Sequence, residues 1–144
     1  MTERIVAPDA GVPLRSGQVC YWKVRAWDRD GHPGPWGPVA LWSMGLLRPE
    51  EWQGEWIGLD VPDDTTENRV LPARWLRKEF TVKGNVVRAI ASIAGLGLSE
   101  LYCNGVKAGD HVLSPALSDY TKRVYYVTHD VTPLLTAGRN AIGV

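Results

Sequence analysis

This 144-residue sequence has a formal net charge of zero and no long apolar run. Sixteen Lys and Arg residues balance sixteen Asp and Glu residues, so no basic excess indicates a nucleic-acid partner. No run approaches the roughly 20 apolar residues that span a bilayer, which argues against a membrane partner. The N-terminal residues MTERIVAPDAG lack the apolar core of a secretory signal, which favours the cytoplasm.

Only two cysteines are present, Cys20 and Cys103, and their separation fits no metal or redox motif. We expect each to fill a strand position as a small buried apolar group, and this is favoured over a disulfide. The three histidines, His32, His111 and His129, stand apart with no further ligand at metal-binding spacing. We therefore expect no metal and no cofactor.

Helical periodicity is also missing, since no stretch keeps an amphipathic period for three turns. Fifteen Gly and ten Pro residues instead divide the chain into short alternating runs, a pattern typical of an antiparallel β-sandwich. The predicted fold class is all-β. The expected strands are residues 18–27, 38–44, 75–82, 86–95, 98–103, 106–109 and 123–130.

The clearest local signals lie between Leu98 and Val144. Asn104-Gly105 predicts a two-residue type I′ turn, because both positions need a positive φ. Thr132 is expected to cap a short helical turn that begins at the following proline. The chain then re-enters an apolar run, so we expect a sandwich that is incomplete at its C-terminus. Its unpaired edge near Val144 would favour association.

Patterns that carry chemistry are weak. Asp28-x-Asp30-Gly lacks the further oxygen ligands and closing Glu of a calcium loop, so it reads as an ordinary turn. A catalytic triad is disfavoured because no Gly-x-Ser-x-Gly supplies a nucleophile. Glycoside hydrolysis needs two placed carboxyl groups, and no pattern pairs the acidic residues available. Those residues are Glu79, Glu100, Asp110, Asp119 and Asp130. Catalysis within this chain is not supported.

Residues 119–125 are the candidates for carbohydrate contact. Sugar rings stack on exposed aromatic side chains while charged groups bond to the hydroxyls, which suits Asp119, Tyr120, Arg123 and Tyr125. The simpler interpretation is that Tyr125 and Tyr126 merely alternate in and out of a sandwich, and strand geometry favours it.

A set of motifs in the second part of the chain matches a known family. They are Leu76-Arg77-Lys78-Glu79-Phe80-Thr81-Val82, Gly95-Leu96-Gly97, Glu100-Leu101-Tyr102, Asn104-Gly105, Gly109-Asp110, Ser118-Asp119-Tyr120-x-Lys122-Arg123-Val124 and Tyr126-x-Thr128-x-Asp130-Val131-Thr132. Together they resemble the N-terminal β-sandwich domain of bacterial α-L-rhamnosidases, and the hairpin and Asp-Val-Thr turn also resemble jelly-roll domains. Residues 21–28 and 44–47 resemble the end of a fibronectin type III-like domain. The predicted organisation is a partial fibronectin-like segment over 1–47 and the sandwich over 48–144.

The resemblance implies an enzyme family that hydrolyses terminal α-L-rhamnose with inversion. The family's acid and base carboxylates lie in a downstream (α/α)₆ barrel, which implies that no catalytic residue lies in this chain. The expected role is a non-catalytic accessory region that scaffolds that barrel, its expected partner, and contacts rhamnose-containing glycans. Two alternatives stay open: a stand-alone carbohydrate-binding module and a structural sandwich that mediates contacts.

Overall fold

The computed structural model describes residues 13–58 and 73–144, and all paired strands within them are antiparallel. Helical structure in these ranges is confined to two single 3₁₀ turns, so the all-β prediction is confirmed. The chain falls into two compact units that divide between Glu55 and Trp56. The predicted division after residue 47 stays a prediction. Over the same ranges, no helix has the length and apolar character needed to cross a membrane.

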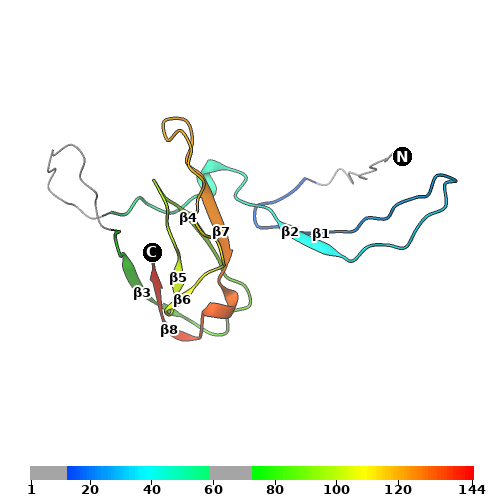
Figure 1. Ribbon diagram of the computed structural model, residues 1–144. Helices are drawn as coiled ribbons and strands as arrows, with labels where there is room; N and C mark the ends of the chain where they lie inside the picture. Colours follow the sequence, from blue (N-terminus) through cyan, green and yellow to red (C-terminus); the bar gives the residue numbers. More distant parts are fainter. Residues whose placement is uncertain (1–12, 59–72) are drawn as a thin grey trace. The chain divides into compact units, whose positions relative to one another are not determined.

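The first unit is built on a two-stranded ribbon, β1 (Val19–Trp22) and β2 (Ala40–Ser43), shown in Figure 1. Beyond the strands the two chain segments stay together through backbone hydrogen bonds. The N–H of Gly37 donates to the carbonyl of Val24 at 2.7 Å, and the N–H of Gly34 donates to Ala26 at 2.8 Å. The regular strands are therefore shorter than the predicted 18–27 and 38–44, but the hairpin that they form was correctly predicted.

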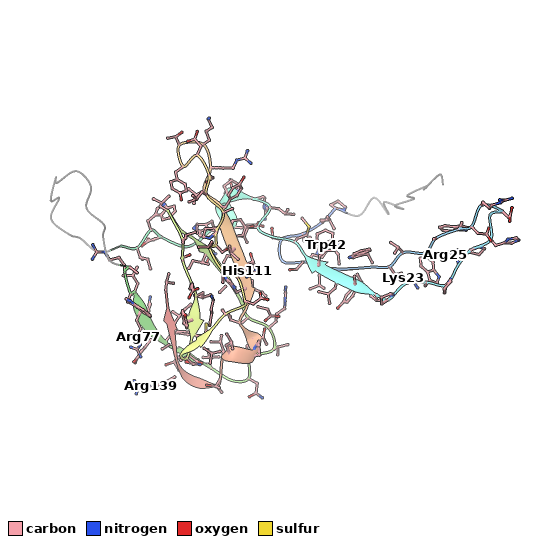
Figure 2. All side chains as sticks on the ribbon, viewed as in Figure 1. Lys23, Arg25, Trp42, Arg77, His111 and Arg139 are labelled. Carbon is pink, nitrogen blue, oxygen red and sulfur yellow. The ribbon has the colours of Figure 1, made fainter. Side chains whose placement is uncertain are left out.

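Cations and indole rings stack along one side of this ribbon. Residues two apart on an extended chain face the same way, so Lys23, Arg25 and Trp27 share a side. The Arg25 guanidinium lies 4.8 Å from the Trp27 ring centre and 4.6 Å from that of Trp36, and the Lys23 ammonium lies 4.5 Å from Trp36. Lys23 and Arg25 are labelled on the ribbon in Figure 2. We call these four residues the cation–aromatic ladder.

A short 3₁₀ turn, η1 (Pro49–Glu51), follows the ribbon and is tied back to it. The Glu51 carboxylate accepts hydrogen bonds from the hydroxyl of Ser16 and from the backbone N–H groups of Leu47 and Arg48. The Ser16 hydroxyl and the Arg48 guanidinium lower the pKa of Glu51 to about 2. The carboxylate thus joins two segments that are 35 residues apart.

The second unit contains a four-stranded sheet and a two-stranded sheet. The larger sheet has the strand order β3 (Arg77–Val82), β8 (Gly138–Gly143), β5 (Tyr102–Cys103) and β6 (Val106–Lys107). The smaller sheet pairs β4 (Ile90–Ala94) with β7 (Tyr126–Asp130), and η2 (Thr132–Leu134) follows β7. Figure 1 shows the strands of this unit.

The core of the second unit lies between its two sheets. Leu101, Cys103, Ala108 and Val131 are its buried centre. Side chains from both sheets pack against that centre, including Ala91 and Ile93 of β4 and Ile142 of β8. Two sheets that share one apolar layer form a sandwich. Cys103 is 1 % exposed, and burial raises the pKa of its thiol. Both cysteines are free, and Cys20 is half-buried.

The predicted turn at Asn104-Gly105 is confirmed, with φ angles of 51° and 82°. The Asn104 side chain also fastens the turn to distant parts of the unit. Its amide group donates to the Leu134 carbonyl at 2.8 Å and to the Asn140 side-chain oxygen at 2.9 Å, and its oxygen accepts from the N–H of Ala141 at 2.9 Å. The turn is therefore held from outside as well as by its own backbone preference.

Thr132 does not cap the helical turn, so that prediction was wrong. The residue lies inside η2, and Val131 precedes the turn without a side-chain cap. The hydroxyl of Thr132 instead accepts from the backbone N–H of Ala89 at 2.9 Å, next to β4. The Asp130 carboxylate accepts a hydrogen bond from the backbone N–H of Thr132, also at 2.9 Å. The hydroxyl expected to cap the turn therefore binds the backbone of a residue 43 positions away.

Two further expectations about strands need correction. The strand expected over residues 86–95 is shorter than predicted, because β4 begins only at Ile90, and Val87 before it is 91 % exposed. The edge near Val144 is paired: Leu76 and Val144 exchange two backbone hydrogen bonds of 2.9 Å, and β8 lies between β3 and β5. That pairing joins residues far apart in the sequence, which local patterns do not reveal.

Candidate functional site

The four predicted sugar-contacting residues lie on one loop, which precedes β7 and projects beyond the strands in Figure 1. The Asp119 carboxylate is already engaged within that loop. It pairs with the Lys122 ammonium at 2.8 Å and accepts from the Thr121 hydroxyl and backbone N–H at 2.6 and 3.1 Å. Lys122 and Thr121 lower the pKa of Asp119. The main structural role of this carboxylate is therefore to close its own turn.

The other three candidates are less constrained. Tyr120 and Tyr125 are 40 % and 43 % exposed, so part of each ring is available for stacking. The backbone of Arg123 completes the loop: its N–H donates to the Asp119 carbonyl at 3.0 Å, and its carbonyl accepts from the Ser118 hydroxyl at 2.8 Å. The structure thus brings the candidates onto one loop, and none of them lines the pocket described next.

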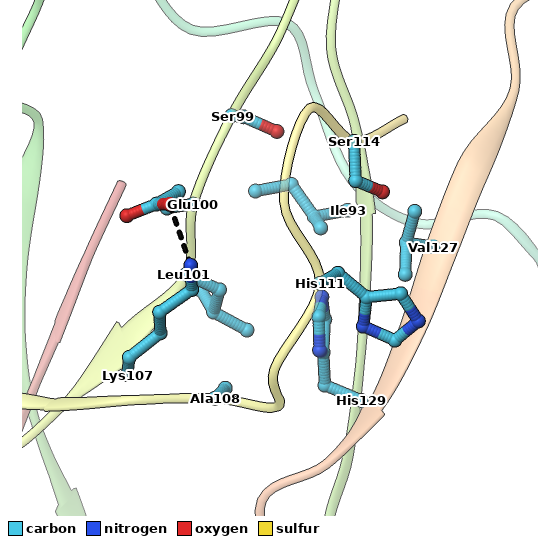
Figure 3. Close-up of a pocket in the computed structure, with 10 residues that line it drawn as sticks. All are labelled: Ile93, Ser99, Glu100, Leu101, Lys107, Ala108, His111, Ser114, Val127 and His129. Carbon is cyan, nitrogen blue, oxygen red and sulfur yellow. Dashed lines mark hydrogen bonds and ion pairs between the residues drawn. The ribbon is translucent and has the colours of Figure 1, made fainter. Parts of the chain in front are cut away.

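A small pocket is lined by residues of β4, β6 and β7 and of the segments that follow β4 and β6, and Figure 3 shows this lining. We call it the His pocket. It is lined by Ile93, Ser99, Glu100, Leu101, Lys107, Ala108, His111, Ser114, Val127 and His129. Its volume of about 10 Å³ matches a single water molecule. A sugar ring needs far more room than this, since ligand pockets measure roughly 300–1,000 Å³.

Two histidines that look isolated in the sequence meet in the His pocket. The ring centres of His111 and His129 are 5.6 Å apart and the rings are nearly perpendicular, at 88°. Burial, together with the nearby His111 ring, lowers the pKa of His129. The lowered pKa favours the neutral form of the His129 imidazole. The sequence does carry a sign that His129 is buried. Side chains along β7 alternate between exposed and inward-facing, and His129 lies on the same face as the inward-facing Val127 and the buried Val131.

Gly109 allows the two rings to approach. Its φ of +78° is a left-handed angle that favours glycine. A side-chain carbon at this position would lie 3.2 Å from Nδ1 of His129 and 3.3 Å from Nδ1 of His111. Both rings thus crowd the space that the glycine leaves free.

A hydrogen-bonded chain of three side chains stands at the margin of the His pocket. The Glu100 carboxylate accepts from the Lys107 ammonium at 2.5 Å and from the Tyr102 hydroxyl at 2.8 Å. Lys107, and then Tyr102, lowers the pKa of Glu100, while the Glu100 carboxylate raises the pKa of Tyr102. Glu100 is accordingly an ionised partner of a cation.

The other carboxyl groups with a shifted pKa also have a pKa below the ordinary value. Glu79 lies between Arg139 at 2.8 Å and Arg77 at 2.7 Å, and these two cations, labelled in Figure 2, lower its pKa. The carboxyl groups with a lowered pKa are Asp28, Glu51, Glu79, Glu100, Asp119 and Asp130. A glycosidase general acid has a raised pKa instead, so that it can protonate the leaving group.

Asp28 confirms the predicted turn. Its carboxylate accepts from the N–H groups of Asp30 and His32 at 2.9 and 2.8 Å, which is ordinary turn chemistry. Across residues 13–58 and 73–144, no group of three His, Cys, Asp or Glu side chains is placed to hold a metal ion.

Two family models match the chain. Residues 84–144 match the α-L-rhamnosidase N-terminal domain, and residues 2–48 match the Rha78A-like, N-terminal immunoglobulin domain. The second description names an immunoglobulin domain, so the fibronectin type III likeness of this segment stays a prediction.

Relatives and solved structures agree with the models. The chain is 34 % identical to an α-L-rhamnosidase of Formosa agariphila over 138 residues, which is 93 % of this chain and 15 % of the relative. The structure of an α-L-rhamnosidase from Dictyoglumus thermophilum matches with a TM-score of 0.74 and 36 % identity, over 90 % of this chain and 16 % of that one. The structure of the Aspergillus terreus enzyme matches with a TM-score of 0.68 and 36 % identity, over 91 % and 15 %. The chain thus spans about 15 % of the length of the relatives it matches. These matches place the chain in the α-L-rhamnosidase family, as a counterpart of its N-terminal region.

Proposed function

We propose that this chain is a non-catalytic accessory region of an α-L-rhamnosidase, and that it scaffolds the domain that cleaves terminal α-L-rhamnose. The observation that carries the proposal is the extent of the match. Both compact units correspond to N-terminal domains, while the relatives are more than six times longer. A region of that kind acts through contacts with the rest of an enzyme.

The electrostatics of the described residues support the same role. Cations, hydroxyl groups or backbone N–H groups stabilise the ionised form of the carboxyl groups that have a lowered pKa. Each of these contacts also stabilises local structure. A carboxylate held in this state is a poor proton donor at neutral pH. The groups that a glycosidase needs would then come from another domain.

An activity assay tests the non-catalytic role. The chain alone, incubated with a chromogenic aryl α-L-rhamnoside, should release no more aglycone than buffer does. An intact α-L-rhamnosidase at the same molar concentration serves as the positive control. Turnover by the chain alone, retained through further purification, would refute the assignment.

Removing the equivalent region from an intact family member tests the scaffolding role. We expect the remaining enzyme to unfold at a lower temperature, because the faces that this region covers would be exposed to water. Adding the separate chain back should restore part of the lost thermal stability. An unchanged unfolding temperature and unchanged kinetics after the deletion would contradict scaffolding.

Carbohydrate contact is a second candidate role, favoured by the partly exposed rings of Tyr120 and Tyr125 on one projecting loop. A titration with L-rhamnose, followed through backbone amide chemical shifts, should produce saturable changes confined to this loop. Tyr120→Ala should abolish the changes. Tyr21→Ala, which alters an exposed aromatic of the first unit, is the matched control and should preserve them. Shifts that are absent or spread evenly over the chain would count against this role.

A further inference from the structure

One hydroxyl group in the His pocket lacks a partner. Ser99 Oγ is shielded from solvent and forms no hydrogen bond to any protein group. The residue itself is held firmly, because its backbone N–H donates to the Ser114 carbonyl at 2.8 Å. Shielding a hydroxyl from water without a hydrogen bond is unfavourable, so buried hydroxyls are generally paired with protein or with ordered water.

The surroundings of Ser99 Oγ leave space for a small polar molecule. A side-chain carbon on Gly95 would lie 3.3 Å from this oxygen, so the glycine keeps its near side open. The hydroxyl belongs to the lining of the His pocket, together with His111 and His129 (Figure 3). The pocket volume, about 10 Å³, is that of one water-sized sphere.

The chemistry of the lining suits a molecule that both donates and accepts hydrogen bonds. A serine hydroxyl does both, and a neutral imidazole offers one donor and one acceptor nitrogen. An ordered water typically makes about three such bonds in a polar site. The lining residues Lys107 and Glu100 pair with each other, so this pair offers no unmatched charge to an ion.

We propose that the His pocket is a binding site for one ordered water molecule, which hydrogen-bonds to Ser99 Oγ within the lining to which His111 and His129 also belong. The water satisfies the serine hydroxyl. It is part of the folded structure and is independent of the accessory function proposed above.

Counting long-lived internal waters by ¹⁷O magnetic relaxation dispersion tests this site on the full 144-residue chain. Ser99→Ala removes one hydrogen-bonding partner and should lower the count by one. Ser92→Ala is the matched control. Its hydroxyl lies 3.4 Å from that of Thr128, outside the His pocket, and the count should not change. Equal counts in the wild-type chain and the Ser99→Ala variant would overturn the proposal.

A second measurement needs no variant. In the wild-type chain, cross-relaxation between water and the ring protons of His129 should reveal a water held for longer than surface hydration lasts. A crystal structure should show the same molecule within hydrogen-bond distance of Ser99 Oγ. Absence of that cross-relaxation, or a Ser99 hydroxyl that donates directly to an imidazole, would refute the site.

Discussion

Gly109 shows how one position can be restricted twice. Its backbone adopts a left-handed angle, and its missing side chain leaves room for two imidazole rings. Gly84 has a nearly identical φ of +81°, yet no atom lies within 4 Å of the position where its side chain would start. The pair therefore separates backbone strain from steric crowding.

Gly109→Ala should lower the free energy of unfolding more than Gly84→Ala does. The left-handed angle alone costs about 1–2 kcal/mol for alanine, and both variants incur that cost. Crowding of the histidines should add about 1–3 kcal/mol at position 109 only. Urea denaturation of the two variants measures the difference. Equal losses would show that the rings move aside freely.

Asn140 is the most connected buried polar side chain among the described residues. It is 3 % exposed, and its amide donates to the carbonyls of Thr136 and Gly138 at 2.7 and 2.9 Å. Its oxygen accepts from the N–H of Thr136 and from the side chain of Asn104. The network joins the end of η2, the start of β8 and the turn after β5.

Asn140→Ala should destabilise the second unit by about 2–3 kcal/mol, because buried donors and acceptors would lose their partners. Arg139→Ala is the neighbouring control. Its ion pair with Glu79 is exposed to solvent, so this variant should lose much less stability than Asn140→Ala. Chemical denaturation monitored by tryptophan fluorescence provides both values. Similar losses for the two variants would argue against the network as the source of stability.

The β1–β2 ribbon is a two-stranded element, and isolated ribbons of this kind are only marginally stable in water. The cation–aromatic ladder supplies side-chain contacts where the regular ladder of backbone hydrogen bonds has ended. A cation over an indole ring contributes about 0.5–1 kcal/mol at an exposed site. Two such contacts share Trp36, which makes this residue the centre of the ladder.

Trp36→Ala should therefore loosen the outer part of the ribbon. We expect the amide protons of Gly34 and Gly37 to exchange about 5–30 times faster, as a loss of about 1–2 kcal/mol implies. Tyr21→Ala, which removes an exposed aromatic from β1 outside the ladder, should leave both rates within about twofold of the wild-type rates. Unchanged exchange in the Trp36 variant would show that the backbone alone holds this segment.

Across the protein, the lowered pKa values predict a loss of stability in acid. The pKa of His129 lies below the ordinary 6.5, so the unfolded chain binds this proton more readily and stability should decline as the pH falls below about 6.5. Carboxyl groups with a lowered pKa should cause a second decline in folding stability, at more acidic pH. For Glu51 it begins near the ordinary value of 4.5 and continues toward about 2.

Urea midpoints measured between pH 7 and pH 2.5 would show both declines. His129→Gln should remove the first decline and retain the second, whatever its effect on stability at pH 7. A wild-type midpoint that stays constant from pH 7 to pH 5 would contradict the assignment of the first decline to His129.

Features that depend on residues close together in the sequence could be predicted, and features that depend on distant residues could not. Asn104-Gly105 and the Asp28 turn were predicted because their conformations depend on neighbours within a few positions. The alternation that makes β7 a strand is also local. Thr132 was misread because its hydroxyl bonds to Ala89, 43 residues away.

The candidate sites show the same division. Asp119, Tyr120, Arg123 and Tyr125 share a loop as their adjacency requires, yet their sequence gives no sign that the Asp119 carboxylate closes its own turn. The His pocket could not be predicted, because β7 and the segment after β6 meet only once the sandwich has formed.

The central place of β8 in the larger sheet has a consequence for synthesis. The two outer parts of that sheet, β3 on one side and the β5–β6 hairpin on the other, are joined only through β8. A ribosome would therefore have made β3, β4, β5, β6 and β7 before the strand that connects them existed. The β4–β7 pair can form earlier, since both of its strands precede β8. Until β8 emerges, β3 has no partner strand in this sheet, and a chaperone that shields unpaired strands would act during that interval.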